Sequence, residues 1–185
     1  MTPGVLAAVA AVLLVAGVAL LFNGLVRARQ HVREGWAAID VQLQRRASLV
    51  PNLVETVRGY ADYERQTLQR IVEARGALGA ATGPRDAAQA NDDLSGAIRA
   101  VFALAEAYPD LKASDRFGQL QKDLADTETL IARARNYYNG AVEAYNNRVQ
   151  TVPGVLVARL FGFPPAEFFA AEGAARAAVT VDGLG

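Results

Sequence analysis

The sequence predicts an all-α protein in which an N-terminal transmembrane helix is followed by an elongated antiparallel helix bundle. Three observations support this prediction. An uncharged run near the start is long enough to cross a bilayer, and apolar residues elsewhere recur at steps of three and four. The alternation typical of strands is absent except over Ala178–Asp182. We therefore expect an anchor over residues 1–23, a bundle over 24–151, and an apolar C-terminal segment and tail over 152–185.

Composition excludes several classes of function. The 185 residues suffice for one domain. The absence of cysteine excludes disulfides, iron–sulfur clusters, thiolate zinc sites and a cysteine nucleophile, and a single histidine leaves little for histidine-dependent chemistry. The 19 basic and 19 acidic residues cancel, which argues against a nucleic-acid partner. We therefore expect no catalytic residue, no cofactor, no metal and no nucleic acid.

The predicted membrane helix covers Gly4–Phe22, where 19 consecutive residues carry no charge. As a helix this run is about 28 Å long, close to the hydrocarbon thickness of a bilayer. A cleaved secretory signal is the alternative, with Gly17–Ala19 as its cleavage site. However, no lysine or arginine precedes Gly4, and the run is longer than the apolar region of a signal peptide. We expect an uncleaved, single-pass anchor.

Charge on the two sides of this helix predicts its orientation. Arg27, Arg29 and Arg33 follow it, opposed only by Glu34, and no basic residue precedes it. Because basic residues stay on the cytoplasmic side, we expect the N-terminus outside and the bundle in the cytoplasm, with the chain in the inner cell membrane.

The first arm of the bundle is predicted over Val32–Leu78. Apolar residues recur there at steps of three and four, with gaps at Arg46 and Glu64. Pro51 would clash with the carbonyl of Ala47 in an unbroken helix. Because the spacing keeps its phase across the proline, we favour a kinked helix, and a tight turn three residues before it is the alternative.

The next elements follow from capping and breaking signals. The glycine- and proline-rich stretch Gly76–Pro84 predicts a loop. Asn91 or Asp92 would cap a second helix, which Tyr108–Asp110 would end. Ser114 is the expected cap of the last long helix, with an aspartate in its first turn.

The last long helix has the most regular pattern in the chain. Its stripe runs for 33 residues in steps of three or four, which predicts one continuous buried face. The stripe consists of Phe117, Leu120, Leu124, Thr127, Ile131, Ala134, Tyr138, Ala141, Tyr145 and Val149.

Along this stripe a tyrosine–asparagine pair occurs twice, as Tyr138-Asn139 and Tyr145-Asn146. The spacing of seven places both pairs on one face of the helix. One interpretation is a recognition stripe. We favour a structural one, in which buried tyrosine hydroxyls reach a partner and the asparagines fix register, because both tyrosines lie on the apolar stripe.

The other polar residues form no reactive constellation. His31 lies among arginines beside the membrane without a second histidine, so we interpret it as an interfacial polar residue. A di-metal site in a bundle needs Glu-x-x-His motifs, and the sequence contains none. We interpret as solvated or flanking charges Glu55, Glu64, Glu73, Glu128 and Glu143. Arginine greatly outnumbers lysine. Two explanations are equally good: buried pairing, such as that of Arg135 with Asp40 or Glu128, and genomic base composition.

The segment Val152–Phe169 is unusually apolar for a tail. Packing over the end of the bundle is one interpretation, and contact with the membrane surface or a partner is the other. In a rod-like bundle with one end near a bilayer, the two are compatible. The residues concerned are Leu156, Leu160, Phe161, Phe163, Phe168 and Phe169.

Four runs, in this order, resemble the LemA family: Ala38–Glu64, Glu106–Ser114, Thr127–Asn146, and the sequence FGFPPAEFF at Phe161–Phe169. The resemblance extends over residues 25–181, and the N-terminal span also fits. It implies a membrane anchor with the amino terminus outside, a bundle of four helices and no established catalytic activity. The family is also similar to certain magnetosome membrane proteins, which implies a membrane-organising role.

Two details bear on this resemblance. Four helices favour a division of the long first arm near Pro51 and weaken the preference for a single kinked helix. Tyr63 stands where histidine is common in the family, and Ser48 and Gly140 stand where aspartate is common. A family function that relied on that histidine or on an aspartate at position 48 would be lost here.

The sequence thus favours a non-enzymatic, membrane-anchored helical bundle that acts as a scaffold, adaptor or membrane organiser in the cell envelope. Its expected partners are the lipid bilayer and envelope proteins, with a homo-oligomer as a further expected form. The alternative is a sensory or small-ligand-binding bundle that signals through its span, with a pocket near Tyr138 and Asn139. A hydrolase would need converging acid, base or metal groups, which the sequence does not offer.

Overall fold

The computed structural model describes residues 2–60 and 64–170, and these ranges contain helices but no strand. The predicted all-α class is therefore confirmed. The elements are α1 (Pro3–Arg58), α2 (Arg65–Ala80), α3 (Pro84–Ala105), α4 (Pro109–Lys112), α5 (Asp115–Gln150) and α6 (Gly154–Phe161). Tyr63 and the strand-like alternation at Ala178–Asp182 lie outside the described residues.

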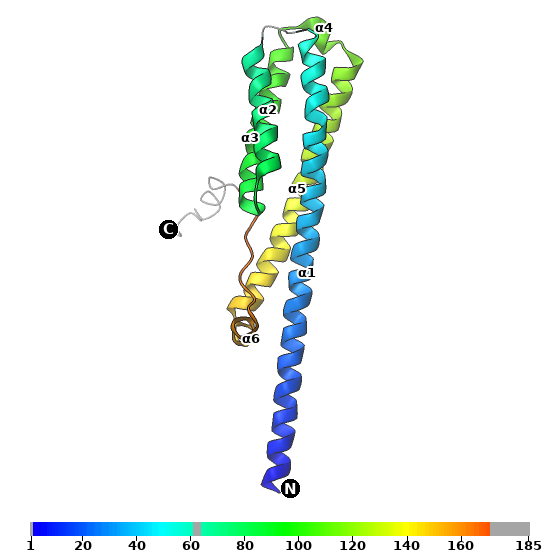
Figure 1. Ribbon diagram of the computed structural model, residues 1–185. Coiled ribbons are helices and arrows are strands. Elements are labelled where there is room, and N and C mark those ends of the chain that lie inside the picture. The colour runs from blue at the N-terminus through cyan, green and yellow to red at the C-terminus, as the bar shows by residue number, and fades with distance from the viewer. Residues whose placement is uncertain (1, 61–63, 171–185) are drawn as a thin grey trace, which may run out of the picture.

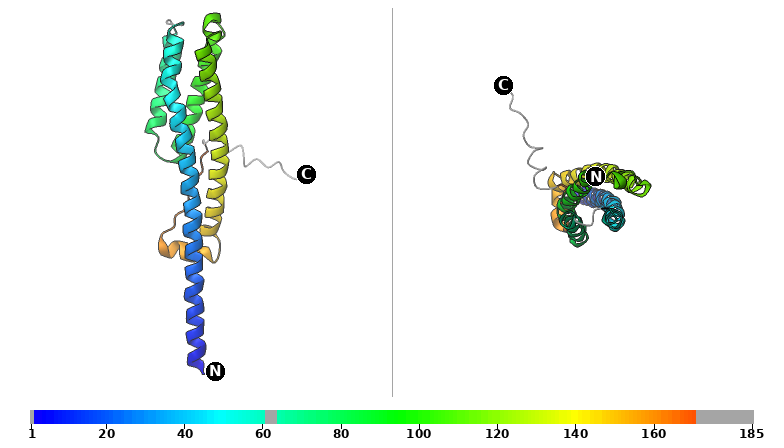
Figure 2. Two further views of the ribbon diagram at one scale, coloured as in Figure 1. Left: turned by 90° about the vertical axis from the view of Figure 1, so that its right-hand side faces the viewer. Right: turned by 90° about the horizontal axis from the view of Figure 1, so that it is seen from above.

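Two long helices, α1 and α5, run antiparallel along the bundle (Figure 1). The α2–α3 hairpin packs beside them over the half farther from the N-terminus, and α6 lies across the nearer end (Figures 1 and 2). We call the part that contains α2, α3 and α4 the distal half, and the part between the hairpin and α6 the proximal half. Four helices lie side by side in the distal half only, because α2 and α3 are short.

The first arm differs from its prediction in where the chain reverses. α1 passes through Pro51 as a helix, as we favoured, but ends at Arg58, and α2 begins at Arg65. The continuous arm predicted over Val32–Leu78 is therefore wrong. Each of the two helices has its own apolar stripe with the same three-and-four spacing, so the spacing does not reveal the reversal between them.

Pro51 is accommodated by a contact between helices. A proline inside a helix removes the N–H that would bond the carbonyl four residues earlier, here that of Ala47. The Arg75 Nε of α2 donates to this carbonyl at 3.1 Å. The carbonyl that the proline leaves free thus links α1 to α2.

The start of α3 also differs from its prediction. The helix begins at Pro84, after Gly83 with φ of 90°, instead of at Asn91 or Asp92. Asn91 is buried in the interior of the helix. A proline in the first turn is favourable because its fixed φ suits the helix and its missing N–H needs no partner. The first two turns of α3 bury mainly alanines. Because alanine indicates a buried helix face less clearly than leucine or valine does, the sequence did not reveal the earlier start of the helix.

The stripe predicted on α5 is confirmed. Its members are buried except for Ala134 and Ala141, which are half-buried. α5 begins at Asp115 after Ser114 as expected, although the Ser114 side chain makes no capping hydrogen bond. One buried residue lies beside the predicted stripe: Val142, which is 0% exposed.

The N-terminal part of α1 is apolar and lies outside the bundle (Figure 1). An 18-residue window in it has a mean hydropathy of 3.0, and none of this window is buried. Among the described residues, α1 alone is long and apolar enough to cross a membrane. Because the same helix continues into the bundle, no linker separates the anchor from the bundle.

Candidate interaction sites

A nine-residue segment after α6, Gly162–Ala170, closes the proximal half, and we call it the strap. Gly162 has a φ of 69°, in the left-handed region that favours glycine. The Phe163 N–H donates to the Ala158 carbonyl at 2.9 Å, which completes the end of α6. From this turn the chain runs back alongside α5 toward the lower end of α3 (Figure 1).

Two tyrosines of α5 bond to the strap backbone. The Tyr145 hydroxyl donates to the Pro164 carbonyl at 2.9 Å, and the Tyr138 hydroxyl donates to the Glu167 carbonyl at 2.7 Å. Burial raises the pKa of Tyr138 to about 12, and the Glu167 carboxylate adds to this shift. Burial also raises the pKa of Tyr145, and the positive charge of Arg29 opposes this shift. Both phenols are therefore neutral donors at physiological pH.

The asparagine that follows each tyrosine makes a two-way contact with the strap. The Asn146 amide nitrogen donates to the Ala166 carbonyl at 2.9 Å, and its oxygen accepts the Ala166 N–H at 2.8 Å. Asn139 makes the same pair of bonds with Phe169, at 3.3 Å and 2.9 Å. Each asparagine thus supplies the hydrogen-bond donor and acceptor that the backbone of a neighbouring β-strand would supply in a sheet. The strap, as an isolated extended segment, has no such neighbour.

The spacing of the two pairs follows from helix and strand geometry. Seven residues of α-helix rise about 10.5 Å, and three residues of extended chain span about 10 Å. The tyrosines, seven apart, bond to Pro164 and Glu167, which are three apart. The asparagines bond to Ala166 and Phe169, also three apart. A heptad on α5 therefore matches three residues of the strap, and Pro164-Pro165 bring no backbone N–H that would need a partner.

The strap also contacts α1 through aromatic packing. The Trp36 ring centroid lies 5.9 Å from that of Tyr138 and 6.3 Å from that of Phe169. The two helices approach closely at this level, because a Cβ added to Gly35 would come within 3.0 Å of the Tyr138 Cα. The strap thus fills the space beside Tyr138 and Asn139 on the side of α5 that faces it. An open hollow of about 460 Å³ lies on the neighbouring face, lined by residues that include His31, Tyr137 and Gly140. The structural interpretation of the tyrosines is confirmed, with the difference that the asparagines fix the register of the strap.

A buried arginine marks the junction of the two halves. Arg46 is 1% exposed, and its guanidinium donates to the Asn91 side-chain oxygen at 3.0 Å and to Glu128 at 3.4 Å. Burial lowers its pKa, and the Glu128 carboxylate opposes this shift. The sequence presented Arg46 only as a gap in the apolar stripe, although its steps to Leu43 and Val50 place it on that stripe. A pairing of Glu128 with Arg135 was one example of the buried pairing that could explain the excess of arginine, but Glu128 pairs with Arg46 instead.

The remaining predicted polar residues lie apart from one another. His31 is exposed, with its Nδ1 3.1 Å from Glu34, and Asp40 accepts a bond from Gln44. The glutamates interpreted as solvated are exposed at Glu55, Glu73, Glu128 and Glu143, and Glu64 is half-buried. In residues 2–60 and 64–170, no three side chains of His, Cys, Asp or Glu gather into a group that could hold a metal ion.

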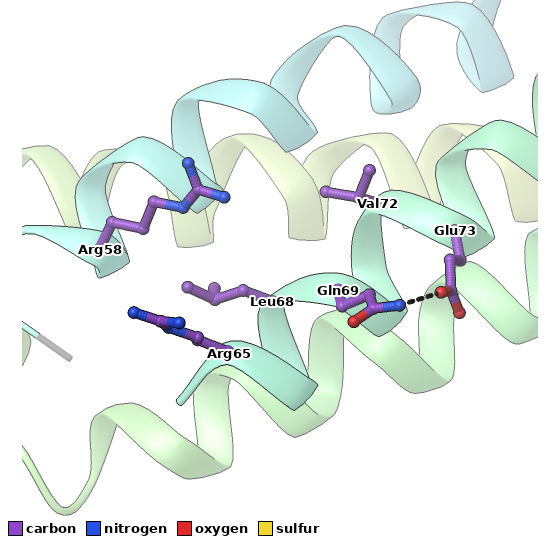
Figure 3. A pocket seen from close by; sticks show the side chains of 6 residues that line it. All are labelled: Arg58, Arg65, Leu68, Gln69, Val72 and Glu73. Carbon is purple, nitrogen blue, oxygen red and sulfur yellow. Dashed lines mark hydrogen bonds between the residues drawn. The ribbon is translucent and has the colours of Figure 1, made fainter. Parts of the chain in front are cut away.

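The distal half carries an open groove between α1 and α2. One hollow of about 490 Å³ is lined by Arg58, Arg65, Leu68, Gln69, Val72 and Glu73. Figure 3 shows Arg58 and Arg65 on either side of Leu68, and the bond of 2.7 Å from Gln69 to Glu73. A second hollow of about 330 Å³ shares Arg58 and Val72 and extends to Pro51 on α1 and Arg75 on α2. We call the two hollows together the distal groove.

The C-terminal apolar segment divides between the two interpretations offered for it. Phe163 and Phe169 are buried in the bundle, so packing over the proximal half is confirmed for them. Leu156 and Leu160 on α6 are 66% and 76% exposed. The bundle itself therefore does not cover these leucines.

Comparison with known proteins shows similarity to one protein family and to several of its relatives. The sequence model of the LemA family matches residues 35–182. The protein LemA of Metamycoplasma hominis is 26% identical over 133 residues, which cover 70% of this chain and 59% of that protein. The chain thus spans less than two thirds of this relative's length.

Two further relatives carry a different name. Magnetosome protein MamQ 2 of Paramagnetospirillum magneticum is 23% identical over 191 aligned positions, which cover 89% of this chain and 70% of the relative. Magnetosome protein MamQ of Magnetospirillum gryphiswaldense is 23% identical over 174 positions, which cover 80% of this chain and 64% of the relative. The similarity to these proteins includes most of the helical bundle.

Proposed function

The chain belongs to the LemA family, and from this membership and its architecture we propose that it is a non-enzymatic, membrane-anchored scaffold of the cell envelope. In this proposal the protein holds the distal groove at a fixed height above the bilayer, where a second envelope protein binds it. The similarity to magnetosome proteins supports a membrane-organising form of the same role.

The observation on which the proposal rests is the continuity of α1. The helix runs from Pro3 to Arg58 without a break, so the exposed apolar span and the bundle share one helix. From Phe22 to Arg58 it rises about 54 Å. A flexible linker would let a domain move freely near the membrane, whereas this helix fixes the height of whatever binds at its far end.

Charge beside the span supports a cytoplasmic bundle in the inner membrane. Arg27, Arg29 and Arg33 are exposed on α1 immediately after the apolar run. Basic residues close to a span favour the cytoplasmic side. The N-terminal end of the span would then lie outside.

The distal groove suits a partner segment that is amphipathic and acidic. Val72 is 48% exposed and contributes to both hollows, so the groove offers apolar surface to a partner. Arg58 and Arg65 stand beside it and can pair with carboxylates. The hydrocarbon of the partner would bury against Val72 while its acidic side chains meet the two guanidinium groups.

Site-specific photocrosslinking in cells tests this proposal. A photoreactive residue replaces Val72 in the full chain, and the matched control carries it at Val41, which is 59% exposed on α1 outside the groove. We expect discrete protein adducts at position 72, and the yield of adducts at position 41 should be several-fold lower. Arg58→Glu should lower the yield at position 72. Equal adducts at both positions, or no adduct together with a strictly monomeric chain, would contradict the proposal.

A further inference from the structure

The proximal end of the bundle carries an apolar face that the described chain leaves uncovered. α6 lies across this end, where α1 emerges from the bundle (Figures 1 and 2). Its inner residues Val157 and Ala158 are buried. On its outer face Leu156 and Leu160, four residues apart, are 66% and 76% exposed, and Val152 just before the helix is 80% exposed. Single exposed leucines are common in proteins, but a contiguous group of exposed apolar side chains on one helix face indicates an interaction site.

Aromatic contacts fix α6 at the level where the span ends. The ring of Phe22, which ends the run without charged or strongly polar residues, lies 5.0 Å from that of Phe161 and 5.6 Å from that of Phe163. Val18 and Leu21, up to one turn deeper in the span, pack against the same cluster. The depth of α6 is therefore tied to the depth of the last turn of the span.

The length of the span leaves no room to lift α6 away from a bilayer. The run Gly4–Phe22 is about 28 Å long, and the hydrocarbon core it must cross is about 30 Å thick. Raising the bundle by one helical turn would draw Val18, Leu21 and Phe22 out of hydrocarbon. Because these residues and α6 move together, the exposed leucines must lie at the membrane boundary whenever the span is inserted.

Cationic side chains surround this face at the height expected for lipid headgroups. Arg29 lies over the Phe163 ring at 5.9 Å, and the Arg148 guanidinium donates to the Gly24 carbonyl at 3.1 Å, so both stand just above Phe22. Arg159 is exposed in the last turn of α6 itself. Apolar residues facing acyl chains beside arginines that reach phosphates are the pattern of a helix lying in a bilayer interface.

We propose that α6 is a second membrane contact, a short interfacial helix whose Val152, Leu156 and Leu160 insert into the bilayer beside the span. The inference rests on the membrane anchoring in the proposed function, but it adds a lipid-binding face that the anchor alone does not require. With two contacts, the span and α6, the bundle is held against tilting, which a single helix would allow.

Spin labels test the depth of this face in the full chain. The protein has no cysteine, so Leu160→Cys gives a single labelling site. The labelled chain is reconstituted into vesicles of phosphatidylcholine and phosphatidylglycerol, and its collisions with oxygen, which concentrates in lipid, are compared with those with a water-soluble nickel chelate. Leu14→Cys in the span and Val72→Cys in the distal groove are the controls. We expect an oxygen-to-nickel collision ratio at position 160 several-fold above that at position 72, and a Leu156→Cys label should give the same result.

The controls separate the ways in which the inference can fail. If position 14 is in lipid while position 160 is as accessible to nickel as position 72, α6 is not in the interface and the inference is wrong, although the anchor stands. If position 14 is also accessible to nickel, the span is not inserted and the anchored scaffold fails with it. Strong dipolar broadening at position 160 that disappears on dilution with unlabelled chain would show that a second copy covers the face, which also overturns the inference.

Discussion

The distal and proximal halves close the same pair of helices in two different ways. In the distal half the α2–α3 hairpin packs mainly against α1, and Phe102 of α3 contacts Phe117 of α5. Side chains such as Ile71 and Leu94 are fully buried there. In the proximal half a nine-residue strap takes the place of two helices (Figure 1). A helix satisfies its own backbone and needs only an apolar face, whereas an extended segment brings unpaired N–H and C=O groups that its neighbours must satisfy. The tyrosines and asparagines of α5 supply those partners.

This difference predicts that a change in the distal half destabilises the whole bundle, whereas a change in the strap destabilises the proximal half alone. Apolar burial in the distal half involves several helices at once, so its loss should lower the stability of the whole bundle. The strap is held by directional contacts with α5 and by the packing of only two buried side chains, Phe163 and Phe169, so its loss should open the proximal half locally. Three changes test this contrast, ordered from the largest expected effect to the smallest.

Leu94→Ala should have the largest effect, because Leu94 is 0% exposed in the distal core. Removing a buried leucine side chain leaves a cavity and lowers the free energy of unfolding by about 3 kcal/mol. The measurement is denaturant unfolding of the full chain in micelles, followed by circular dichroism. Val72→Ala, on the exposed side of α2, serves as the control and should change the same quantity by less than about 0.5 kcal/mol. Equal losses for the two variants would show that the distal half is not held by its core.

Asn146→Leu should release the strap while leaving the distal half folded. The substitution keeps a side chain of similar size but removes both bonds to Ala166, at a local cost of about 2 kcal/mol. Amide hydrogen exchange should accelerate at Ala166 and Phe169 without a matching change in α3. Asn147→Leu is the matched control, since Asn147 is the next residue and is exposed. If exchange in α3 accelerated equally, the two halves would be one cooperative unit and the contrast would be wrong.

The two halves also differ in how far the sequence reveals them. The stripe Phe117–Val149, the span and the passage of α1 through Pro51 depend on helical periodicity and length, which are local properties of the chain. The reversal after Arg58 was missed because the stripe has the same spacing on both sides of it. The early start of α3 at Pro84 was missed because its first turns bury alanines.

The strap shows a second limit of prediction from sequence. The seven-residue repeat of tyrosine and asparagine placed four side chains on one face of α5, but their partners lie 19 to 30 residues away in a segment with no periodicity of its own. A non-local partner cannot be deduced from one helix. The match between a heptad and three extended residues becomes visible only when both segments are placed together. Arg46 was missed for a related reason, because its partners Asn91 and Glu128 come from two other helices.

Alkaline pH should produce the smallest of the three effects and should act through the proximal half. The pKa of Tyr138 is raised to about 12, chiefly by burial, whereas an unfolded tyrosine ionises near 10. A raised pKa in the folded state means that this contribution is fully present below about pH 10 and is lost as the pH rises toward about 12. At about pH 11 the loss is about 1 kcal/mol of unfolding free energy.

Tyr138→Phe isolates this effect, because phenylalanine cannot ionise. The variant begins with lower stability, since the Glu167 carbonyl loses its donor, but its unfolding free energy should fall less than that of the unmodified chain between about pH 9 and about pH 11. Tyr145 is present in both proteins, so its own raised pKa cancels in the comparison. Parallel losses in the two proteins would mean that Tyr138 ionises as freely in the folded state as in the unfolded one. The strap would then not seal this tyrosine from water, and the proximal half would be open where the distal half is closed.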